Sequence, residues 1–209
     1  MPAMQPTLPN GFLLVVEGID GAGKSTVARA LAEHCRALGY HVTQSYEPTS
    51  GQWGTLLRQS AKSGRLPLDE ELELFIKDRV EHVETLIRPA LARGGIVILD
   101  RYYLSTAAYQ GARGADPEEI LARNEEFAPK PDLVLLLDFD PAAGLERIRA
   151  RGDRPDDFEG EQALVKVRGV FLQITRPFMR RIDAAQPAPD VLGRCVAELD
   201  CALEAKKRS

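Results

Sequence analysis

Short apolar runs alternate along this chain with segments in which apolar residues recur at helical spacing. Three of the runs are continuous, as expected for strands that are covered on both faces in a parallel sheet. They span residues 12–16, 96–99 and 133–137, and a weaker run spans 40–43. This alternation of strands and helices predicts a doubly wound α/β fold.

Helical periodicity predicts which faces of the intervening segments are buried. An early helix carries Val27, Leu31 and Leu38 on one stripe, and a later one carries Leu72, Phe75, Ile76, Arg79 and Val83. A closing helix is expected over residues 190–205, with a stripe formed by Val191, Leu192, Val196, Leu199 and Leu203. Cys195 and Cys201 are expected on or beside that stripe, as core or near-core residues.

A charged stretch with Gly and Pro interrupts the pattern at residues 149–160. It predicts a loop or lid inserted after a helix, and we place the lid at about 147–160. There is no internal repeat or low-complexity linker, and 209 residues suit one domain. We therefore expect a single domain over residues 11–209 and a flexible leader over residues 1–10.

Composition narrows the class of protein. The chain has 27 Lys and Arg against 31 Asp and Glu, a net charge of −4, which argues against binding bulk nucleic acid or an anionic membrane. The leader lacks a basic segment and an apolar core, so it is not a signal peptide, and no apolar run approaches a membrane span. Cys35, Cys195 and Cys201 form no metal-ligand pair, which favours a reduced compartment. A cytoplasmic protein is expected.

The first strand leads into a glycine-rich phosphate-binding motif. The sequence is Gly18-Ile19-Asp20-Gly21-Ala22-Gly23-Lys24-Ser25, which matches G-x-x-x-x-G-K-[ST] at every fixed position. Glycines let backbone N–H groups turn toward phosphate oxygens, and the following helix N-terminus adds positive potential. These residues, with Thr26, are the expected ATP site. Lys24 is expected to contact the β- and γ-phosphates, and Ser25 to ligate Mg²⁺.

Asp100 ends the strand at residues 96–99, where P-loop enzymes place a second carboxylate of the Mg²⁺ shell. The alternative is an ordinary helix cap, but the adjacent Arg101 favours the functional interpretation. The P-loop motif alone does not separate kinases, GTPase switches and motor ATPases.

Three further segments resemble thymidylate kinases. Residues 100–110 read DRYYLSTAAYQ, similar to the D-R-[YH]-x-x-S-x-x-A-Y-Q of that family. Glu47-Pro48 follows the second strand, and residues 74–79 (LFIKDR) are similar to L-F-x-x-D-R. The likeness covers residues 11–203. It implies a P-loop NTPase fold with a mainly parallel five-stranded sheet, flanking helices and a small lid. It also implies a homodimer that transfers the γ-phosphoryl group of ATP to dTMP, with Mg²⁺, giving dTDP and ADP for dTTP synthesis.

The resemblance also implies roles at the acceptor phosphate. Arg101 would bind the phosphate through its planar guanidinium, with Arg58 as a second arm. Asp20 would face the sugar 3′-hydroxyl or the Mg²⁺ shell. Glu47 and Ser105 would complete this end of the site.

At the nucleoside, Phe75 would stack on thymine and Arg79 would donate to a base carbonyl. Thr106 and Gln110 would meet polar edges of the base, and Tyr109 would lie against the deoxyribose. The alternatives are that Phe75 and Tyr109 are plain core aromatics, and that Arg58 and Arg79 are solvated surface residues.

The acceptor determines what catalysis requires. The second pKa of a monophosphate is about 6, so the attacking oxygen is largely ionised at neutral pH and needs no general base. Catalysis then reduces to aligning two phosphates and neutralising charge with Mg²⁺, Lys24 and arginines.

Arginines crowd the approach to the predicted lid. A solvated basic helix end would explain them, but arginines on a flap can also close over the γ-phosphate. Some thymidylate kinases place an arginine at the position of Gly21, and this chain resembles those that do not and instead use lid arginines. We therefore expect catalytic roles for Arg149, Arg151 and Arg154, and note Arg147 on the same face as Arg151.

One loop departs from the family pattern R-E-P-G-G-T. The chain has Tyr46 in place of that arginine, and Trp53 follows nearby, for which packing is the expected role. Glu47 and Trp53 also suit a deoxynucleoside kinase, in which a Glu deprotonates a 5′-hydroxyl. Those enzymes usually carry E-R-S where this chain has Asp100-Arg101-Tyr102. A GTP-dependent switch would need an N-K-x-D segment, which is absent. The sequence does not decide between dTMP and dUMP as acceptors.

Overall fold

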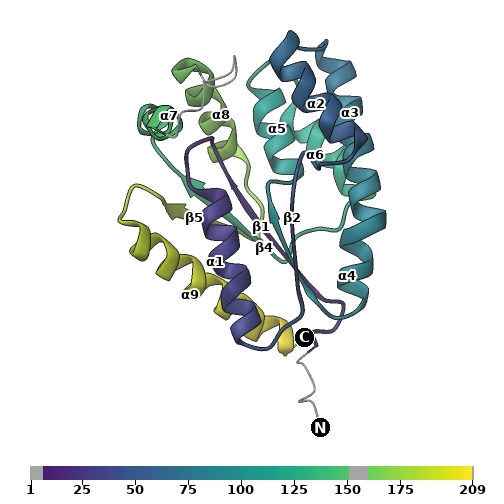
Figure 1. The fold of residues 1–209 in the computed structure, drawn as a ribbon, viewed down its shortest axis with the longest axis vertical. Coiled ribbons are helices and arrows are strands. Elements are labelled where there is room, and N and C mark those ends of the chain that lie inside the picture. Colours follow the sequence, from purple (N-terminus) through teal and green to yellow (C-terminus); the bar gives the residue numbers. More distant parts are fainter. Residues whose placement is uncertain (1–6, 151–159, 209) are drawn as a thin grey trace.

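The structure is a computed structural model that describes residues 7–150 and 160–208. Within them, five strands form one sheet in the order β2-β3-β1-β4-β5, and every neighbouring pair is parallel (Figure 1). The strands are β1 (Phe12–Gly18), β2 (Val42–Tyr46), β3 (Ile96–Asp100), β4 (Leu133–Asp138) and β5 (Met179–Asp183). The predicted doubly wound α/β fold is confirmed.

Helices cover both faces of this sheet (Figure 1). They are α1 (Lys24–Ala37), α2 (Gln52–Ser63), α3 (Leu68–His82), the π-helical turn η1 (Val83–Ile87), α4 (Arg88–Ala92), α5 (Tyr103–Gly111), α6 (Pro117–Glu125), α7 (Pro141–Ala150), α8 (Glu161–Gln173) and α9 (Ala188–Lys207). Helices α1 and α9 pack on one face, while α4 and α5 pack on the other, where α6 and α8 adjoin α5.

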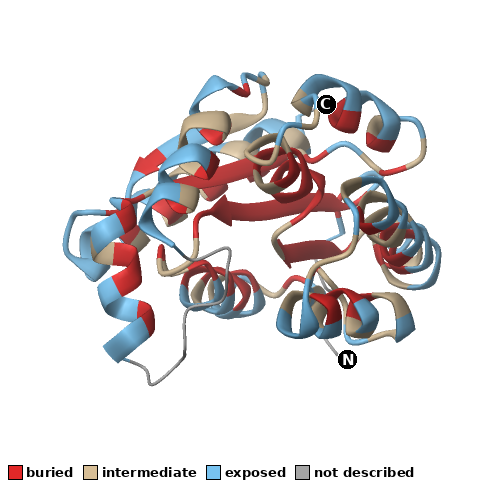
Figure 2. Ribbon diagram, turned by 90° about the horizontal axis from the view of Figure 1, so that it is seen from above, coloured by how far each residue is buried: buried red, intermediate tan, exposed pale blue. Residues whose placement is uncertain are grey.

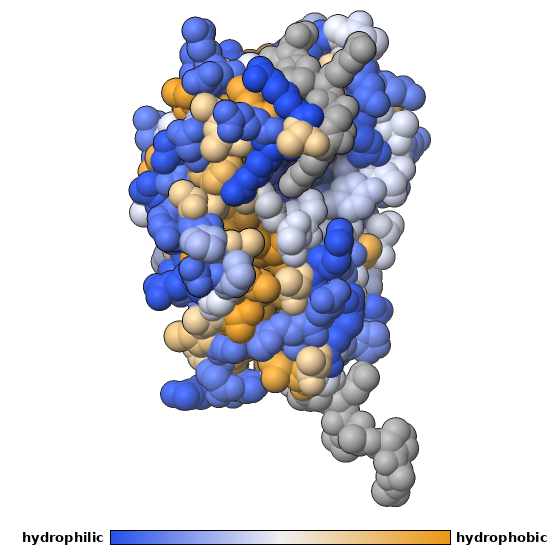
Figure 3. Space-filling model, turned by 60° about the vertical axis from the view of Figure 1, so that its left-hand side comes forward, coloured by the Kyte–Doolittle hydropathy of each residue, from blue (hydrophilic) through white to orange (hydrophobic). Residues whose placement is uncertain are grey.

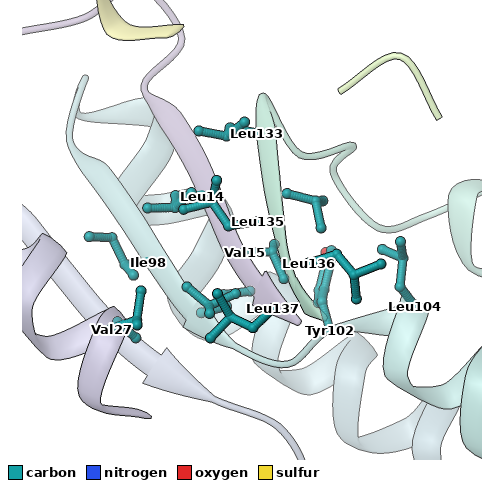
Figure 4. Close-up of a cluster of buried hydrophobic side chains, with 14 of the residues drawn as sticks. Leu14, Val15, Val27, Ile98, Tyr102, Leu104, Leu133, Leu135, Leu136 and Leu137 are labelled. Atoms are coloured by element: carbon teal, nitrogen blue, oxygen red, sulfur yellow. The ribbon is translucent and has the colours of Figure 1, made fainter. Parts of the chain in front are cut away.

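The three apolar runs form the centre of the core. All residues of β1 are buried, as are those of β3 and β4 apart from their last residues. Figure 4 shows their side chains meeting, among them Leu14, Ile98 and Leu135, with Val27 of α1 beside Ile98. Seen from above, the strands are buried and the helices turn their buried sides toward them (Figure 2). A central parallel strand buries both faces, which is why these runs are continuous in sequence.

The two edge strands were harder to predict. The weak run at residues 40–43 placed the second strand too close to the N-terminus. Strand β2 runs from Val42 to Tyr46 and is only partly buried. Strand β5 has no apolar run: Arg180 and Arg181 are exposed and only Ile182 is buried. Charged side chains on an edge strand protect it from pairing with another chain, and they also hide it from a hydrophobicity search.

Two predicted core positions are exposed. Leu38 is 49% exposed because α1 ends at Ala37, and the helix instead buries small residues such as Ala28, Ala32 and Cys35. In α9, Cys195 is buried as expected, but Cys201 is exposed. Cys201 follows Cys195 by six positions, which places the two side chains about 120° apart around the helix axis.

Helix α3 buries polar residues instead of an apolar stripe. Glu71, Asp78, Arg79 and His82 are buried, whereas Leu72, Phe75 and Ile76 are only partly covered. Val83 is buried but belongs to the π-helical turn η1, which shifts it from the predicted stripe. A helix that turns buried charges inward must satisfy them there, which suggests that it lines a functional site.

The ends of the described segments bear on two further predictions. Leu8, in the expected leader, is buried, and its N–H donates to the carbonyl oxygen of Gly94 at 3.0 Å, so this part of the leader packs on the sheet domain. Residues 147–150 of the expected lid end α7, and residues 151–159 lie outside the described residues. No helix in the described ranges is long and apolar enough to span a membrane. Hydrophilic side chains predominate on the face shown in Figure 3.

The carboxyl ends of the central strands meet at one edge of the sheet. Asp100, the last residue of β3, pairs in register with Val16 of β1 and Tyr46 of β2. Ligands of open α/β sheets bind at this edge, where neighbouring strands connect in opposite directions. The phosphate-binding motif, Glu47 and Arg101 therefore leave the sheet side by side.

Candidate active site

The glycine-rich motif forms a tight turn between β1 and α1. Its glycines have positive φ angles of 142° at Gly18, 81° at Gly21 and 96° at Gly23, which residues with a side chain rarely adopt. The Lys24 side chain folds back over the turn, and its Nζ donates to the Ile19 carbonyl oxygen at 2.8 Å. The helix N-terminus and this ammonium together form the expected cradle for phosphate.

Lys24 is prepared for a polyanion by its surroundings. Burial, and to a lesser degree the charge of nearby Arg101, lower the pKa of its ammonium to about 8. Asp20 offsets part of this effect, with Oδ1 at 3.7 Å from Nζ. A buried cation with too little negative charge around it is stabilised when phosphates arrive.

The turn packs directly on α7. A Cβ added at Gly21 would collide with the backbone of Gly144, and one added at Gly144 would lie 2.8 Å from the Asp20 carbonyl oxygen. From the same helix, Arg147 donates to the Gly21 carbonyl oxygen at 3.3 Å, and its guanidinium lies 3.9 Å from the centre of the Phe139 ring. There is no room here for an arginine at position 21 unless α7 moves.

Oxygen ligands suitable for Mg²⁺ lie beside the turn. The Ser25 hydroxyl donates to Asp100 Oδ2. The other carboxylate oxygen, Asp100 Oδ1, is buried and has no hydrogen-bond partner among the described residues. An orphaned buried carboxylate oxygen is costly unless a cation or water satisfies it, and Mg²⁺ is commonly held by one or two protein oxygens plus phosphates. The residues present therefore fit this metal.

Arg101 lies in the connection between β3 and α5, with a positive φ of 72°. Its guanidinium donates to Asp20 Oδ1, to Ser105 Oγ at 3.0 Å and to Tyr109 Oη at 3.2 Å. The Tyr109 hydroxyl donates to Asp20 Oδ2 at 2.7 Å. Burial alone would raise the pKa of Asp20, but Arg101 and Lys24 lower it well below its ordinary value. Asp20 is therefore ionised and forms an ion pair with the Arg101 guanidinium.

A carboxylate that the sequence analysis missed lies beneath Arg101. Glu17 is fully buried in β1 and accepts hydrogen bonds from the N–H of Tyr102 at 2.9 Å and from the Ser105 hydroxyl at 2.5 Å. Burial raises its pKa to about 7, although Ser105 and Arg101 counteract that rise. The sequence signal that could have identified Glu17 is its position, a charged residue directly after the apolar run at residues 12–16.

Arg79 is held from several sides in the interior. Its Nε donates to Glu47 Oε2 at 2.8 Å, NH1 donates to Asn124 Oδ1 at 2.5 Å and NH2 donates to Thr106 Oγ1 at 3.0 Å. His82 contacts the other oxygen of Glu47 through Nδ1 at 3.0 Å. Arg79 is 1% exposed, so it is not a solvated surface residue.

The loop after β2 is fixed by the same helix. Asp78 of α3 accepts from the backbone N–H of Thr49 at 2.8 Å and from its hydroxyl at 2.6 Å. Arg58 of α2 donates to the carbonyl oxygen of Pro48 at 2.8 Å. Asp78 therefore shapes the loop that carries Glu47, a role that sequence did not reveal.

These groups surround one cavity of about 330 Å³. Every residue that the sequence assigned to the acceptor lines it: Asp20, Glu47, Arg58, Phe75, Arg79, Arg101, Ser105, Thr106, Tyr109 and Gln110. A second cavity of about 480 Å³ adjoins it, shares Glu47, Pro48, Arg58 and Arg101, and reaches Ser25 and Asp100. The cavity lined by the acceptor residues therefore adjoins a second cavity beside the P-loop.

Other predicted residues stand apart from this cavity. Thr26 is exposed on the first turn of α1, while Ile19 and Ala22 of the motif are buried. Arg149 is exposed one residue before the end of α7. Arg151 and Arg154 lie outside the described residues.

Trp53 packs away from the cavity lining. The Lys77 ammonium of α3 lies 5.1 Å from the centre of its ring, and Trp53 is not among the residues that line the acceptor cavity. This agrees with the expected packing role. It also weakens the deoxynucleoside kinase alternative, in which a Trp lies near the catalytic Glu.

Comparisons with known proteins agree on one family. The family model described as thymidylate kinase matches residues 16–193. A protein of Xanthomonas euvesicatoria pv. vesicatoria named thymidylate kinase is 54% identical over 195 residues, or 93% of this chain and 86% of its own length. One from Akkermansia muciniphila with the same name is 55% identical over 184 residues, or 88% of this chain and 89% of its own.

Proposed function

Because this chain belongs to the thymidylate kinase family of ATP:dTMP phosphotransferases, we propose that it transfers the γ-phosphoryl group of ATP to dTMP in the cavity beside its P-loop. The products are dTDP and ADP. The observation that carries the proposal is that one cavity gathers the residues assigned to the acceptor from four separate segments of the chain. Residues 11–209 would act as one catalytic domain.

Arg101 would bind the acceptor phosphate, with Arg58 as the second arm. Both line the cavity, and both also line the adjoining one that reaches the P-loop. To receive the phosphate, Arg101 must exchange its contact with Asp20 for phosphate oxygens. A guanidinium matches two oxygens of a phosphate at once, so the exchange conserves its hydrogen bonds.

The base would lie between Phe75 and the polar groups of α5. Arg79 has donors only, and its partners fix its position before substrate arrives. Thr106 and Gln110 line the same cavity and would contact the base edges. Tyr109, held by Asp20, would lie against the deoxyribose and leave little room for a 2′-hydroxyl.

ATP would bind at residues 18–26, where the turn and the start of α1 provide N–H groups and Lys24. Ser25, Asp100 and Asp20 would hold Mg²⁺, which neutralises phosphate charge when bound. The orphaned oxygen of Asp100 supports that assignment. Since Gly21 offers no side chain, Arg149, Arg151 and Arg154 would supply further positive charge.

The structure supports a phosphate acceptor over a hydroxyl acceptor. In the alternative enzyme, Glu47 would have to act as a general base. Here both of its oxygens are engaged, by Arg79 at 2.6 Å and by His82 at 3.0 Å. Neither oxygen is therefore left free to approach a substrate hydroxyl.

The remaining expectations concern assembly and location. We propose a homodimer, as the family resemblance implies. We place the enzyme in the cytoplasm, which suits the free cysteines Cys35, Cys195 and Cys201. Light scattering at several concentrations tests the dimer.

A coupled assay that detects ADP tests the function. ATP and Mg²⁺ are supplied with dTMP, dUMP or thymidine in separate reactions. Turnover of dTMP that stops on chelation of Mg²⁺ is expected, and the dUMP reaction measures acceptor range. Turnover of thymidine without turnover of dTMP would overturn the proposal.

A further inference from the structure

Helix α5 begins without a cap of its own. Its N-cap residue, Tyr102, has no side-chain capping bond, although the first N–H groups of any helix need acceptors. Glu17 provides them from β1: one oxygen, Oε1, accepts from the N–H of Tyr102 at 2.9 Å and of Ser105 at 3.2 Å. A carboxylate at this place also interacts favourably with the helix dipole.

The second oxygen of Glu17 reaches the catalytic arginine through one intermediary. Glu17 Oε2 accepts from the Ser105 hydroxyl at 2.5 Å, and Ser105 Oγ in turn accepts from Arg101 NH1 at 3.0 Å. Because the hydroxyl has one hydrogen, donating it to Glu17 turns its lone pairs toward Arg101. Glu17 therefore sets the donor-to-acceptor direction of the two hydrogen bonds that link Arg101, Ser105 and Glu17.

Arg101 needs such a restraint. Its φ of 72° is uncommon for a residue with a side chain, so the connection from β3 to α5 is held by its surroundings. Glu17 fixes the residue that follows Arg101 and, through Ser105, also the guanidinium. It is 0% exposed and does not line the acceptor cavity, so it does not contact substrate itself.

We propose that Glu17 is a positioning residue for the phosphate transfer, which holds Arg101 in place by capping α5 and by orienting the Ser105 hydroxyl. The inference rests on the proposed function, because it assigns Arg101 to the acceptor phosphate. It predicts a defect mainly on the acceptor side, since the hydrogen bonds of Glu17 are with Tyr102 and Ser105. The charge of Lys24 in the ATP-binding turn has a smaller effect on the pKa of Glu17 than burial, Ser105 and Arg101 have.

Two substitutions separate positioning from folding. Glu17→Gln keeps the shape and an oxygen for both N–H groups, but its amide donates toward Ser105 Oγ, where the ionised carboxylate accepts. The comparison is therefore made above pH 7, where Glu17 is mostly ionised. Ser105→Ala removes the intermediary and leaves both backbone caps in place. Each is expected to raise the KM for dTMP about tenfold, the effect of one hydrogen bond, with the KM for ATP within about twofold of wild type.

The double variant tests whether both act along one path. If Glu17 acts through Ser105, the double variant should raise the dTMP KM no further than the more severe single variant. Thermal unfolding of each variant confirms that it is folded at the assay temperature. If Glu17→Gln does not fold, Ser105→Ala must still show the split between the two KM values.

Three results would overturn the assignment: an unchanged KM for dTMP, equal increases for dTMP and ATP, or additive effects in the double variant. They differ from a failure of the proposed function. If wild-type protein does not phosphorylate dTMP, the function is wrong. If wild type is active and the variants behave like it, only the role of Glu17 is wrong.

Discussion

Asp20 and Arg101, 81 positions apart in sequence, form an ion pair in the lining of the acceptor cavity. The pair occupies the guanidinium that the acceptor phosphate is expected to use. If Arg101 binds the acceptor phosphate as proposed, Asp20 would compete with dTMP for its guanidinium. The same carboxylate is assigned to the metal shell, so its two roles oppose each other in the empty enzyme.

Asp20→Asn should separate those roles. Without the competing charge, dTMP should bind about tenfold more tightly in the absence of Mg²⁺, as measured by calorimetry. Turnover with Mg²⁺ should fall by at least about 100-fold, since a ligand of the metal shell is lost. Weaker binding of dTMP without Mg²⁺ would show that Asp20 supports the acceptor directly.

Glu47→Gln tests whether a general base is needed. Because the phosphate is already ionised, kcat should stay within about threefold of wild type, whereas loss of a true base lowers kcat by about 10²–10⁴. The KM for dTMP should rise, because Arg79 loses its carboxylate partner. The free energy of unfolding should fall by about 3 kcal/mol, since a buried guanidinium is left unpaired. Steady-state kinetics and urea unfolding measure both effects.

Some features of the fold and site follow from sequence because they are local. The P-loop, the strand before it and the helix after it are adjacent in the chain, so spacing alone places Lys24 and Ser25. Strands buried on both faces are continuous apolar runs and were found. The edge strand β5 was missed because Arg180 and Arg181 face solvent, where hydrophobicity has no role.

The hydrogen-bond partners of the site residues did not follow from the sequence. Arg79 was predicted, but its contacts with Glu47 and Asn124 join segments separated by 32 and 45 positions. His82 looked like an ordinary polar residue of an amphipathic helix, and Asp78 was recognised only as part of the L-F-x-x-D-R resemblance, without a role. Only the tertiary structure shows that they point inward, since burial of polar groups is decided by available partners and not by hydrophobic periodicity.

Glu17 also makes a prediction about stability. Its pKa is about 7 in the folded protein against an ordinary 4.5, so the folded state holds the proton more tightly than the unfolded state. Its stabilising contribution is complete below pH 4.5 and is lost as pH rises through about 7. That loss is up to about 3 kcal/mol in the free energy of unfolding.

Glu17→Gln, which does not titrate, isolates this effect. Urea unfolding of both proteins is measured at about pH 5 and about pH 8, on either side of the pKa of Glu17 in the folded protein. The variant should gain stability relative to wild type at the higher pH. A difference between the two proteins that is independent of pH would show that Glu17 ionises normally.

Arg113 should matter for binding although it does not line the cavity. Its NH1 donates to Gln110 Oε1 at 2.7 Å and also contacts Glu71. A guanidinium has no acceptor, so this contact holds the amide of Gln110 in one orientation. Arg113→Met should raise the KM for dTMP severalfold, because that amide is then free to rotate.

Arg123→Met is the matched control for Arg113. Arg123 is exposed and pairs with the exposed Glu73 at 2.5 Å, and such surface pairs contribute little. Its kinetics should equal those of wild type. Equal effects of the two substitutions would show that the loss reflects general charge and not the orientation of Gln110.

The contact between Gly21 and Gly144 constrains how this enzyme could have evolved. Two catalytic layouts are expected in the family, one with an arginine in the P-loop and one with arginines in the lid. Here the P-loop backbone packs on α7, the helix that precedes the predicted lid, and a side chain at either glycine would collide with the other segment. A single substitution at Gly21 therefore cannot convert one layout into the other. The helix must shift first, so the change requires coupled mutations, and the first of them alone is expected to be deleterious.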